Sequence, residues 1–188
     1  WISENALVSG NAVVSGDARV SGNARVAGNA EIWGNAWVSG DALVSDEAKI
    51  YGNAVITGKA WISSNAKVYG DATVSGNAEI YGNASVYGDA CVIGENAKIY
   101  GNAVTSCNAW VAGNALVGDT AWVTDDARVH GHAKVSGNAL VSNDAEVHGN
   151  ACISGNADVT GNAKVYGDAR ISGYTVVTGN YLLESPKV

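Results

Sequence analysis

Phenylalanine and methionine are absent from this 188-residue sequence, proline occurs once, and charged residues make up only 15%. Hydrophobic residues nevertheless reach 47%, and there are 24 glycines. Such a restricted set of residue types is not that of an ordinary mixed globular domain. The composition therefore indicates a repetitive chain.

The small number of charges is also biased in sign. Eleven Lys and Arg stand against 18 Asp and Glu, for a formal net charge of -7. An acidic surface repels polyanions, and the low charge density argues against a charge-driven disordered chain. No apolar run approaches the roughly 20 residues that cross a bilayer. We expect neither nucleic acid nor a membrane as a partner.

Cysteine is scarce as well. Cys91, Cys107 and Cys152 are odd in number and irregular in spacing, which does not describe a disulfide framework. The chain begins at Trp1, without a methionine and already within its pattern. We interpret it as a processed product or a part of a longer protein, whose first strand edge meets more repeats, another domain or another chain.

A six-residue repeat runs through the whole chain. Arg19 to Ala24 is a typical unit, and 30 such units extend from Trp1 to Tyr181. Position 2 of the unit is Val or Ile in every unit but one, where it is Thr105, and position 6 is Ala in 28 of the 30. Position 4 is usually Gly, and position 5 is Asn or Asp in 25 units.

A period of six excludes an amphipathic helix, because about 3.6 residues per turn would carry the valines around the helix axis. One apolar residue between two largely polar ones is the period-two pattern of a short strand with one buried face. Gly followed by Asn or Asp accepts positive φ and predicts a sharp corner. Such short strands cannot fold alone, so the units must stack in parallel ladders as a β-solenoid.

These residues resemble the hexapeptide-repeat family, which folds as a left-handed parallel β-helix. In that family an aliphatic residue is followed four positions later by a small one, as Val20 is by Ala24 and Ile50 by Ala54. The resemblance implies that three units form one triangular, left-handed coil. The fold predicted is all-β, a single-domain solenoid of about ten 18-residue coils, roughly 45 to 50 Å long at the usual strand spacing.

We place the solenoid at residues 1–181 and a C-terminal tail, expected to cover the last coil, at residues 182–188. One unit, Cys91 to Ala97, has seven residues. We expect its extra residue to form a bulge at Val92 and Ile93. The pattern also departs from the common unit at Val117 and Gly118, where Gly directly follows the aliphatic residue.

With a nearly invariant interior, function must lie in the outward positions 1 and 3 and in the corners. Position 3 of one predicted face is aromatic in four successive coils, at Trp33, Tyr51, Tyr69 and Tyr87. Stacked at one strand spacing, these rings would form a ladder. Such a ladder would stabilise the sheet, support self-association, or bind a sugar.

Position 1 carries apolar residues in groups. The longest group occupies four successive units and comprises Val104, Trp110, Leu116 and Trp122. We expect it to encircle the rod by slightly more than one coil. Grouped outward Trp and Leu side chains are unusual for a monomer and indicate contact with another chain.

Two histidines, His130 and His148, lie 18 residues apart at position 3, with His132 at the nearby corner and Tyr166 one coil further. They are weak candidates for a transition-metal site, since stacked strands hold imidazoles side by side and no fourth ligand is evident. Ordinary surface histidines are the expected interpretation. The Asn and Asp columns of position 5 are expected to cap the backbone at the corners.

Many members of the hexapeptide family are acyltransferases, in which a catalytic His, an extruded loop and a C-terminal helix build the active site of a trimer. No extra segment longer than one residue interrupts this repeat, so we predict no catalytic residue and no cofactor, although the resemblance permits His130 or His148 as a base. We expect a structural or interaction rod that self-associates or attaches to a larger assembly, with carbohydrate as a further ligand. The alternatives are an acyltransferase-like member and, last, an ice-binding solenoid, for which the regular Thr array is missing.

Overall fold

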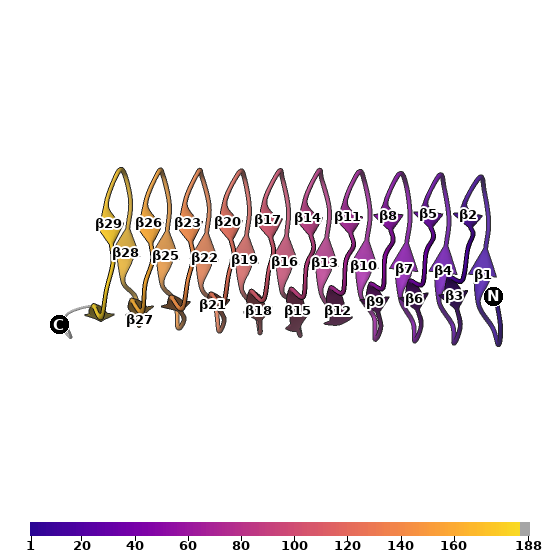
Figure 1. The fold of residues 1–188 in the computed structure, drawn as a ribbon, viewed down its shortest axis with the longest axis horizontal. Helices are drawn as coiled ribbons and strands as arrows, with labels where there is room; N and C mark the ends of the chain where they lie inside the picture. The colour runs from indigo at the N-terminus through magenta and orange to yellow at the C-terminus, as the bar shows by residue number, and fades with distance from the viewer. Residues whose placement is uncertain (185–188) are drawn as a thin grey trace.

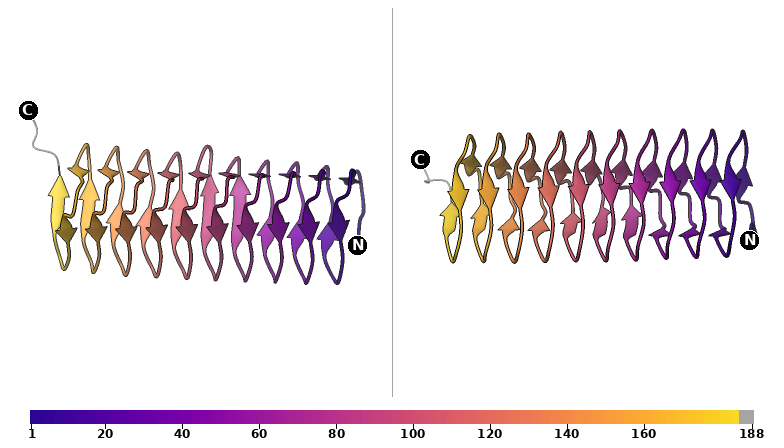
Figure 2. Two further views of the ribbon diagram at one scale, coloured as in Figure 1. Left: turned by 90° about the horizontal axis from the view of Figure 1, so that it is seen from above. Right: turned by 45° about the horizontal axis from the view of Figure 1, so that its top comes forward.

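The computed structural model describes residues 1–184, and no helix occurs among them. Thirty short strands follow one another around a common axis, and every third strand joins the same sheet (Figure 1). The first and the last described coils lie at opposite ends of the rod (Figure 2). The molecule therefore has three faces, each formed by one ten-stranded sheet.

The first face is formed by the strands β1 (Leu7–Val8), β4 (Arg25–Val26), β7 (Leu43–Val44), β10 (Trp61–Ile62), β13 (Glu79–Ile80), β16 (Lys98–Ile99), β19 (Leu116–Val117), β22 (Lys134–Val135), β25 (Cys152–Ile153) and β28 (Arg170–Ile171). All of its neighbouring strands are parallel, as in β10 and β13, where Trp61 pairs with Glu79.

The second face is formed by β2 (Val13–Val14), β5 (Glu31–Ile32), β8 (Lys49–Ile50), β11 (Lys67–Val68), β14 (Ser85–Val86), β17 (Val104–Thr105), β20 (Trp122–Val123), β23 (Leu140–Val141), β26 (Asp158–Val159) and β29 (Val176–Val177). It too is wholly parallel, and Lys67 pairs with Lys49 and Ser85.

The third face is formed by β3 (Arg19–Val20), β6 (Trp37–Val38), β9 (Val55–Ile56), β12 (Thr73–Gly76), β15 (Cys91–Gly94), β18 (Trp110–Ala112), β21 (Arg128–Val129), β24 (Glu146–Val147), β27 (Lys164–Tyr166) and β30 (Leu182–Glu184). An isolated parallel bridge between Ile2 and Val20 extends this ladder toward the N-terminus. The three parallel sheets and about ten coils confirm the predicted solenoid, while its left-handed winding stays a prediction from the family resemblance.

The interior is formed by positions 2 and 6 of the repeat, as predicted. From Ala18 to Ala163 every alanine of position 6 is fully buried, and the Val and Ile of position 2 are equally inaccessible. Burying these side chains is the main stabilising term for a coil that has too few residues to fold by itself. Thr105 replaces one interior aliphatic residue, and its buried hydroxyl has no partner among the described residues.

The extra residue of the seven-residue unit lies in a corner, so the predicted bulge at Val92 and Ile93 is wrong. Strand β15 pairs with β12 without interruption from Cys91 to Gly94, and Ile93 pairs with Ala112 of β18. The ladder continues because a bulge would leave backbone groups unpaired, whereas a corner is free to lengthen. The unit is therefore longer only between Gly94 and Ala97.

The corners have the left-handed backbone conformation that the sequence predicts. Glycines of position 4 have φ near +70°, for example +69° at Gly137. Seven other residues adopt the same conformation: Glu4, Asp46, Ser64, Cys107, Asp119, Asp125 and Asn143. Most of these are short polar residues, which tolerate this region better than branched ones.

The ladder of the third face continues past residue 181, because Leu182–Glu184 pair with β27. The remainder of the predicted end cap, residues 185–188, lies outside the described residues. Within residues 1–184 the structure has no helix of the length and apolar character needed to cross a bilayer.

Candidate functional site

The four aromatic residues of position 3 form a continuous stack on the second face. Ring centroids are 4.6 Å apart between Trp33 and Tyr51, 4.7 Å between Tyr51 and Tyr69, and 4.9 Å between Tyr69 and Tyr87. Neighbouring planes are within 10° of parallel. We call this stack the aromatic ladder. The structure thus brings together all four residues that the sequence singled out.

Parallel rings this close must overlap face to face, since coplanar rings side by side would need a greater separation. Each ring therefore covers its neighbour, and only the outer faces of Trp33 and Tyr87 remain free along the stack. Burial raises the pKa of Tyr69, and the neighbouring Tyr51 and Tyr87 raise it further. A sugar that stacks on a ring face could bind only at the two ends of the ladder. Elsewhere the ladder presents ring edges and hydroxyl groups to solvent.

The apolar group of position 1 is divided among the three faces. Val104 and Trp122 are direct neighbours on the second face, in β17 and β20. Trp110 lies in β18 on the third face, and Leu116 in β19 on the first. The group encircles the rod as expected, but only Val104 and Trp122 share one surface.

A second stack occupies the third face. The rings of His130 and His148 are 5.0 Å apart and nearly parallel, and Tyr166 follows His148 at 5.2 Å. Trp110 lies beyond His130 at 5.8 Å with a tilted plane. Because the imidazole planes are parallel, they do not converge on one point in space.

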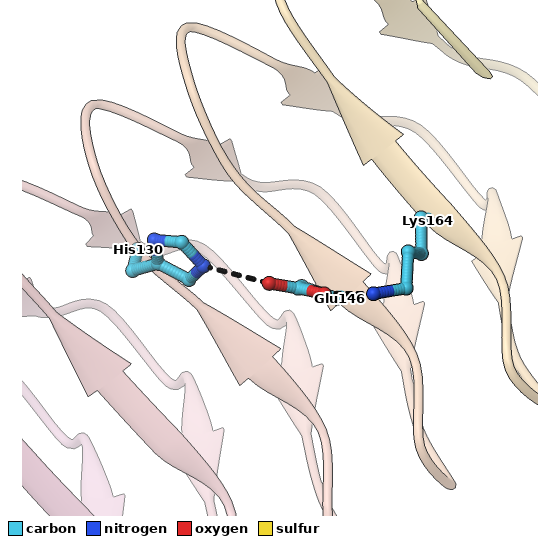
Figure 3. Close-up of polar contacts among 3 residues, drawn as sticks. All are labelled: His130, Glu146 and Lys164. Carbon is cyan, nitrogen blue, oxygen red and sulfur yellow. Dashed lines mark hydrogen bonds and ion pairs between the residues drawn. The ribbon is translucent and has the colours of Figure 1, made fainter. Parts of the chain in front are cut away.

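Glu146 connects this stack to the neighbouring row of position 1. Its carboxylate accepts hydrogen bonds from His130 Nε2 at 3.1 Å and from Lys164 Nζ at 2.8 Å (Figure 3). The hydrogen bond from Lys164, followed by that from His130, lowers the pKa of Glu146 to about 2. The arrangement orients one imidazole and holds a carboxylate ionised, which are the elements of an acid-base pair.

Sequence reasoning missed Glu146 and Lys164, although a signal for them was present. Opposite charges at position 1 lie 18 residues apart in both Glu146 with Lys164 and Glu31 with Lys49, and the second pair also forms an ion pair, at 3.2 Å. Once a coil of 18 residues is predicted, such pairs are expected as neighbours on one face.

The three candidate metal ligands do not assemble into a site. His132 lies at the exposed corner after the third face, apart from the stacked pair of His130 and His148. Within residues 1–184 no group of three or more His, Cys, Asp or Glu side chains could hold a metal ion. The histidines are therefore described best by their stacking and by the contact of His130 with Glu146.

The corner amides bond to one another rather than to the backbone, which corrects the predicted role of position 5. Asn35 donates to Asn53 at 3.0 Å, and Asn53 donates to Asp71 at 2.8 Å one coil further. Backbone capping is done instead by acidic residues of position 4. Asp46, for example, accepts a bond from the amide N–H of Ser64 at 2.9 Å. Asn ladders of this kind add to the stacking energy of parallel coils.

Gly118 occupies position 3 of its unit, where Gly is unusual, because the ring of Tyr100 packs over it. Tyr81 and Tyr100 stack on the first face with centroids 5.6 Å apart. A Cβ atom at Gly118 would overlap ring atoms of Tyr100, so the Tyr100 side chain lies directly over this glycine. The departure from the common unit is thus explained by packing between coils.

We expect Glu146→Gln to lower the free energy of unfolding at pH 7 by about 1 kcal/mol, the upper range for an accessible ion pair. The pKa of Glu146 is lower in the folded protein, so the ionised carboxylate stabilises it above about pH 4.5. That contribution decreases as the pH falls toward 2, where the variant and the original protein should become equally stable.

Urea unfolding at several pH values measures this difference. The matched control is Glu31→Gln, because the Glu31 side chain is 42% exposed and its ion-pair partner is Lys49 alone. It should cost less than Glu146→Gln. A difference for Glu146→Gln that does not change between pH 7 and pH 2 would contradict the role assigned to its carboxylate.

Comparison with known proteins agrees with this architecture. The chain matches a repeat model described as the YdcK beta solenoid repeat at residues 18–31, 48–64, 133–149 and 163–179. No curated protein matches it in sequence. Among solved structures, UDP-N-acetylglucosamine acyltransferase of Francisella novicida superimposes with a TM-score of 0.40 and 18% sequence identity, over 84% of this chain and 62% of that one. The repeat matches and the observed coils show that this chain is a β-solenoid protein of the hexapeptide-repeat type.

Proposed function

We propose that this chain is a non-enzymatic interaction rod, which holds its partners at a defined separation and associates through its exposed aromatic positions. The observation that carries the proposal is the unbroken register of all three sheets. Each sheet has ten strands in parallel register, and the one extra residue is absorbed at a corner. A rod of this kind is stiff because each coil contacts its neighbours along three ladders.

The outward aromatic residues support an interaction role. Trp37 and Trp61 are each 46% exposed, and Trp122 is 48% exposed. Large exposed indole rings are enriched where proteins meet other proteins, because they bury much area at little entropic cost. The rod would present them at fixed heights along its axis.

A second candidate function is acyl transfer by an acyltransferase-like member of the family. The contact between His130 and Glu146 favours it, because an oriented imidazole is what a general base requires. The pair stands on an open sheet face, however, and among residues 1–184 no helix lies beside it to hold a substrate. A hollow on the same face is lined by Trp1, Arg19 and Trp37, many coils away from His130.

The two functions are separated by a thiol-release assay with acetyl-coenzyme A and a set of amine and hydroxyl acceptors. The rod predicts no release above the uncatalysed background, in the original protein or in His130→Ala. Release that is abolished in His130→Ala but retained in His132→Ala, the control at the adjacent corner, would replace the rod with the acyltransferase.

A further inference from the structure

Eight of the ten coils of the second face form two runs of four that differ in height, with Ser15 in the coil before them and Thr178 in the coil after them. Position 3 is aromatic in four coils, and in the next four coils it is Ser106, Thr124, Ser142 and Thr160. We call this second row the Ser/Thr trough. Ser106 is only 2% exposed and Ser142 only 6%. The aromatic ladder is thus a ridge, and the row that continues it is a floor of the same length.

The neighbouring row of position 1 also changes character at the middle of the rod. Beside the aromatic ladder it carries Glu31, Lys49, Lys67 and Ser85. Beside the Ser/Thr trough it carries Val104, Trp122, Leu140 and Asp158. Trp122 pairs with Val104 on one side and with Leu140 on the other, so three apolar side chains form one continuous strip.

We propose that the second face binds a second copy of the same chain in an antiparallel arrangement, with each aromatic ladder lying in the Ser/Thr trough of the other copy. This proposal rests on the proposed function, for which it names the partner. The two-fold axis of this dimer lies in the interface and is perpendicular to both rods. It reverses the order of the coils in the second copy. It also places position 3 of one copy opposite position 3 of the other, and position 1 opposite position 1. Such an interface is isologous, so every contact occurs twice.

The resulting register pairs a large side chain with a small one at each level. Tyr69 of one copy lies opposite Thr124 of the other, and Tyr87 lies opposite Ser106. By the same symmetry Tyr51 faces Ser142 and Trp33 faces Thr160. These eight levels are complementary in height because the aromatic ladder and the Ser/Thr trough each span four coils, and Ser15 faces Thr178 at the outermost levels.

Chemical complementarity in the position 1 row supports the same register. Lys67 lies opposite Trp122, where its ammonium can approach the indole ring and its stem can cover apolar surface. Lys49 lies opposite Leu140. One juxtaposition is unfavourable, Glu31 opposite Asp158, and its charge is reduced because Glu31 already pairs with Lys49 in its own chain.

A parallel arrangement of the same faces fits less well. An axis along the rods would place position 3 opposite position 1 at the same level. Four coils would then bring rings against long charged side chains, and the next four would bring small residues against the apolar strip. The gap between the two copies would be wide along the first four of these coils and narrow along the next four. Two straight rods could therefore not be in contact along their whole length.

The available area is sufficient for a specific dimer. Eight coils at about 4.8 Å, with a face about 15 Å wide, bury roughly 1,100 Å² from the two copies together. This value is near the lower limit for specific interfaces. We therefore expect a reversible dimer whose population depends on concentration.

Sedimentation velocity over a concentration series tests for the dimer, with Thr124→Trp as the variant that fills the trough. The dissociation constant should rise at least tenfold. The matched control is Thr57→Trp, which is the same exchange at position 3 of the third face, and it should leave the constant unchanged. Asp158→Lys should lower the dissociation constant, because it replaces the one repulsive contact with an attractive one. Circular dichroism checks that each variant is folded.

Orientation is measured by the distance between spin labels attached at Ser15→Cys, after the native cysteines are replaced with serine. Ser15 is exposed on the first coil of the second face. The antiparallel dimer places the two labels at opposite ends, about 43 Å apart for nine coil spacings. A short distance, a trimer, a monomer at every concentration, or an unchanged constant in Thr124→Trp overturns the proposal. The thiol-release assay decides the rod function separately.

Discussion

Replacing Val68 with Asp is expected to remove at least about 4 kcal/mol from the free energy of unfolding. Val68 is fully buried in β11 and pairs with Ile50 and Val86 on either side. A carboxylate there would be surrounded by aliphatic side chains with no partner for its charge, which is among the most costly substitutions known. Its effect reaches the adjacent coils, since each coil is stabilised by its two neighbours.

Thermal unfolding followed by circular dichroism measures this effect, and a decrease of about 10 °C or more in Tm is expected for a chain of this size. Lys134→Asp is the control, because Lys134 is exposed at position 1 of β22, on the first face and outside the proposed dimer interface. It should change stability by no more than about 0.5 kcal/mol. If Val68→Asp left Tm unchanged, the assignment of position 2 to the interior would be wrong.

Replacing Gly137 with Ala is expected to cost about 2 to 3 kcal/mol, from two separate causes. The residue has φ of +69°, a conformation that costs alanine about 1 kcal/mol or more. In addition, a Cβ atom at Gly137 would lie 2.7 Å from the carbonyl oxygen of Gly155 in the next coil. The backbones would have to move apart, which weakens the ladder between the two coils.

Gly173→Ala separates the two causes. Gly173 lies in the same column of corners with nearly the same φ, +71°, but a Cβ atom there would meet nothing within 4 Å. It should therefore show the conformational cost alone, about 1 kcal/mol in urea unfolding. Equal losses in the two variants would mean that contact between coils does not limit these corners.

Much of the fold could be predicted because the same constraint is repeated in every unit. Val or Ile at position 2 and Ala at position 6 mark the interior, and Gly at position 4 marks a corner with positive φ. Each assignment depends on a few adjacent residues and is confirmed by many independent copies. The aromatic ladder follows too, because an 18-residue coil places Trp33 and Tyr51 at neighbouring positions.

The errors arose where the outcome depended on contacts with a neighbouring coil rather than on the unit itself. The extra residue near Val92 could lie either in the strand or in the corner. The unbroken backbone pairing of the strand places it in the corner. The side chain of Asn53 could have capped the backbone, but an amide one coil away is a better-placed partner. Both outcomes depend on atoms in a neighbouring coil, which adjacent sequence does not describe.

The sequence by itself determined the period, the interior, the corners and the rows in which outward residues lie. Only the tertiary structure decided how those outward residues meet: that Glu146 bridges His130 and Lys164, and that Tyr100 covers Gly118. The physical reason is a difference in constraint. Interior side chains can pack only into the core of the coil. Exposed side chains can adopt several rotamers, and the rotamer adopted depends on partners that lie a full coil away in the chain.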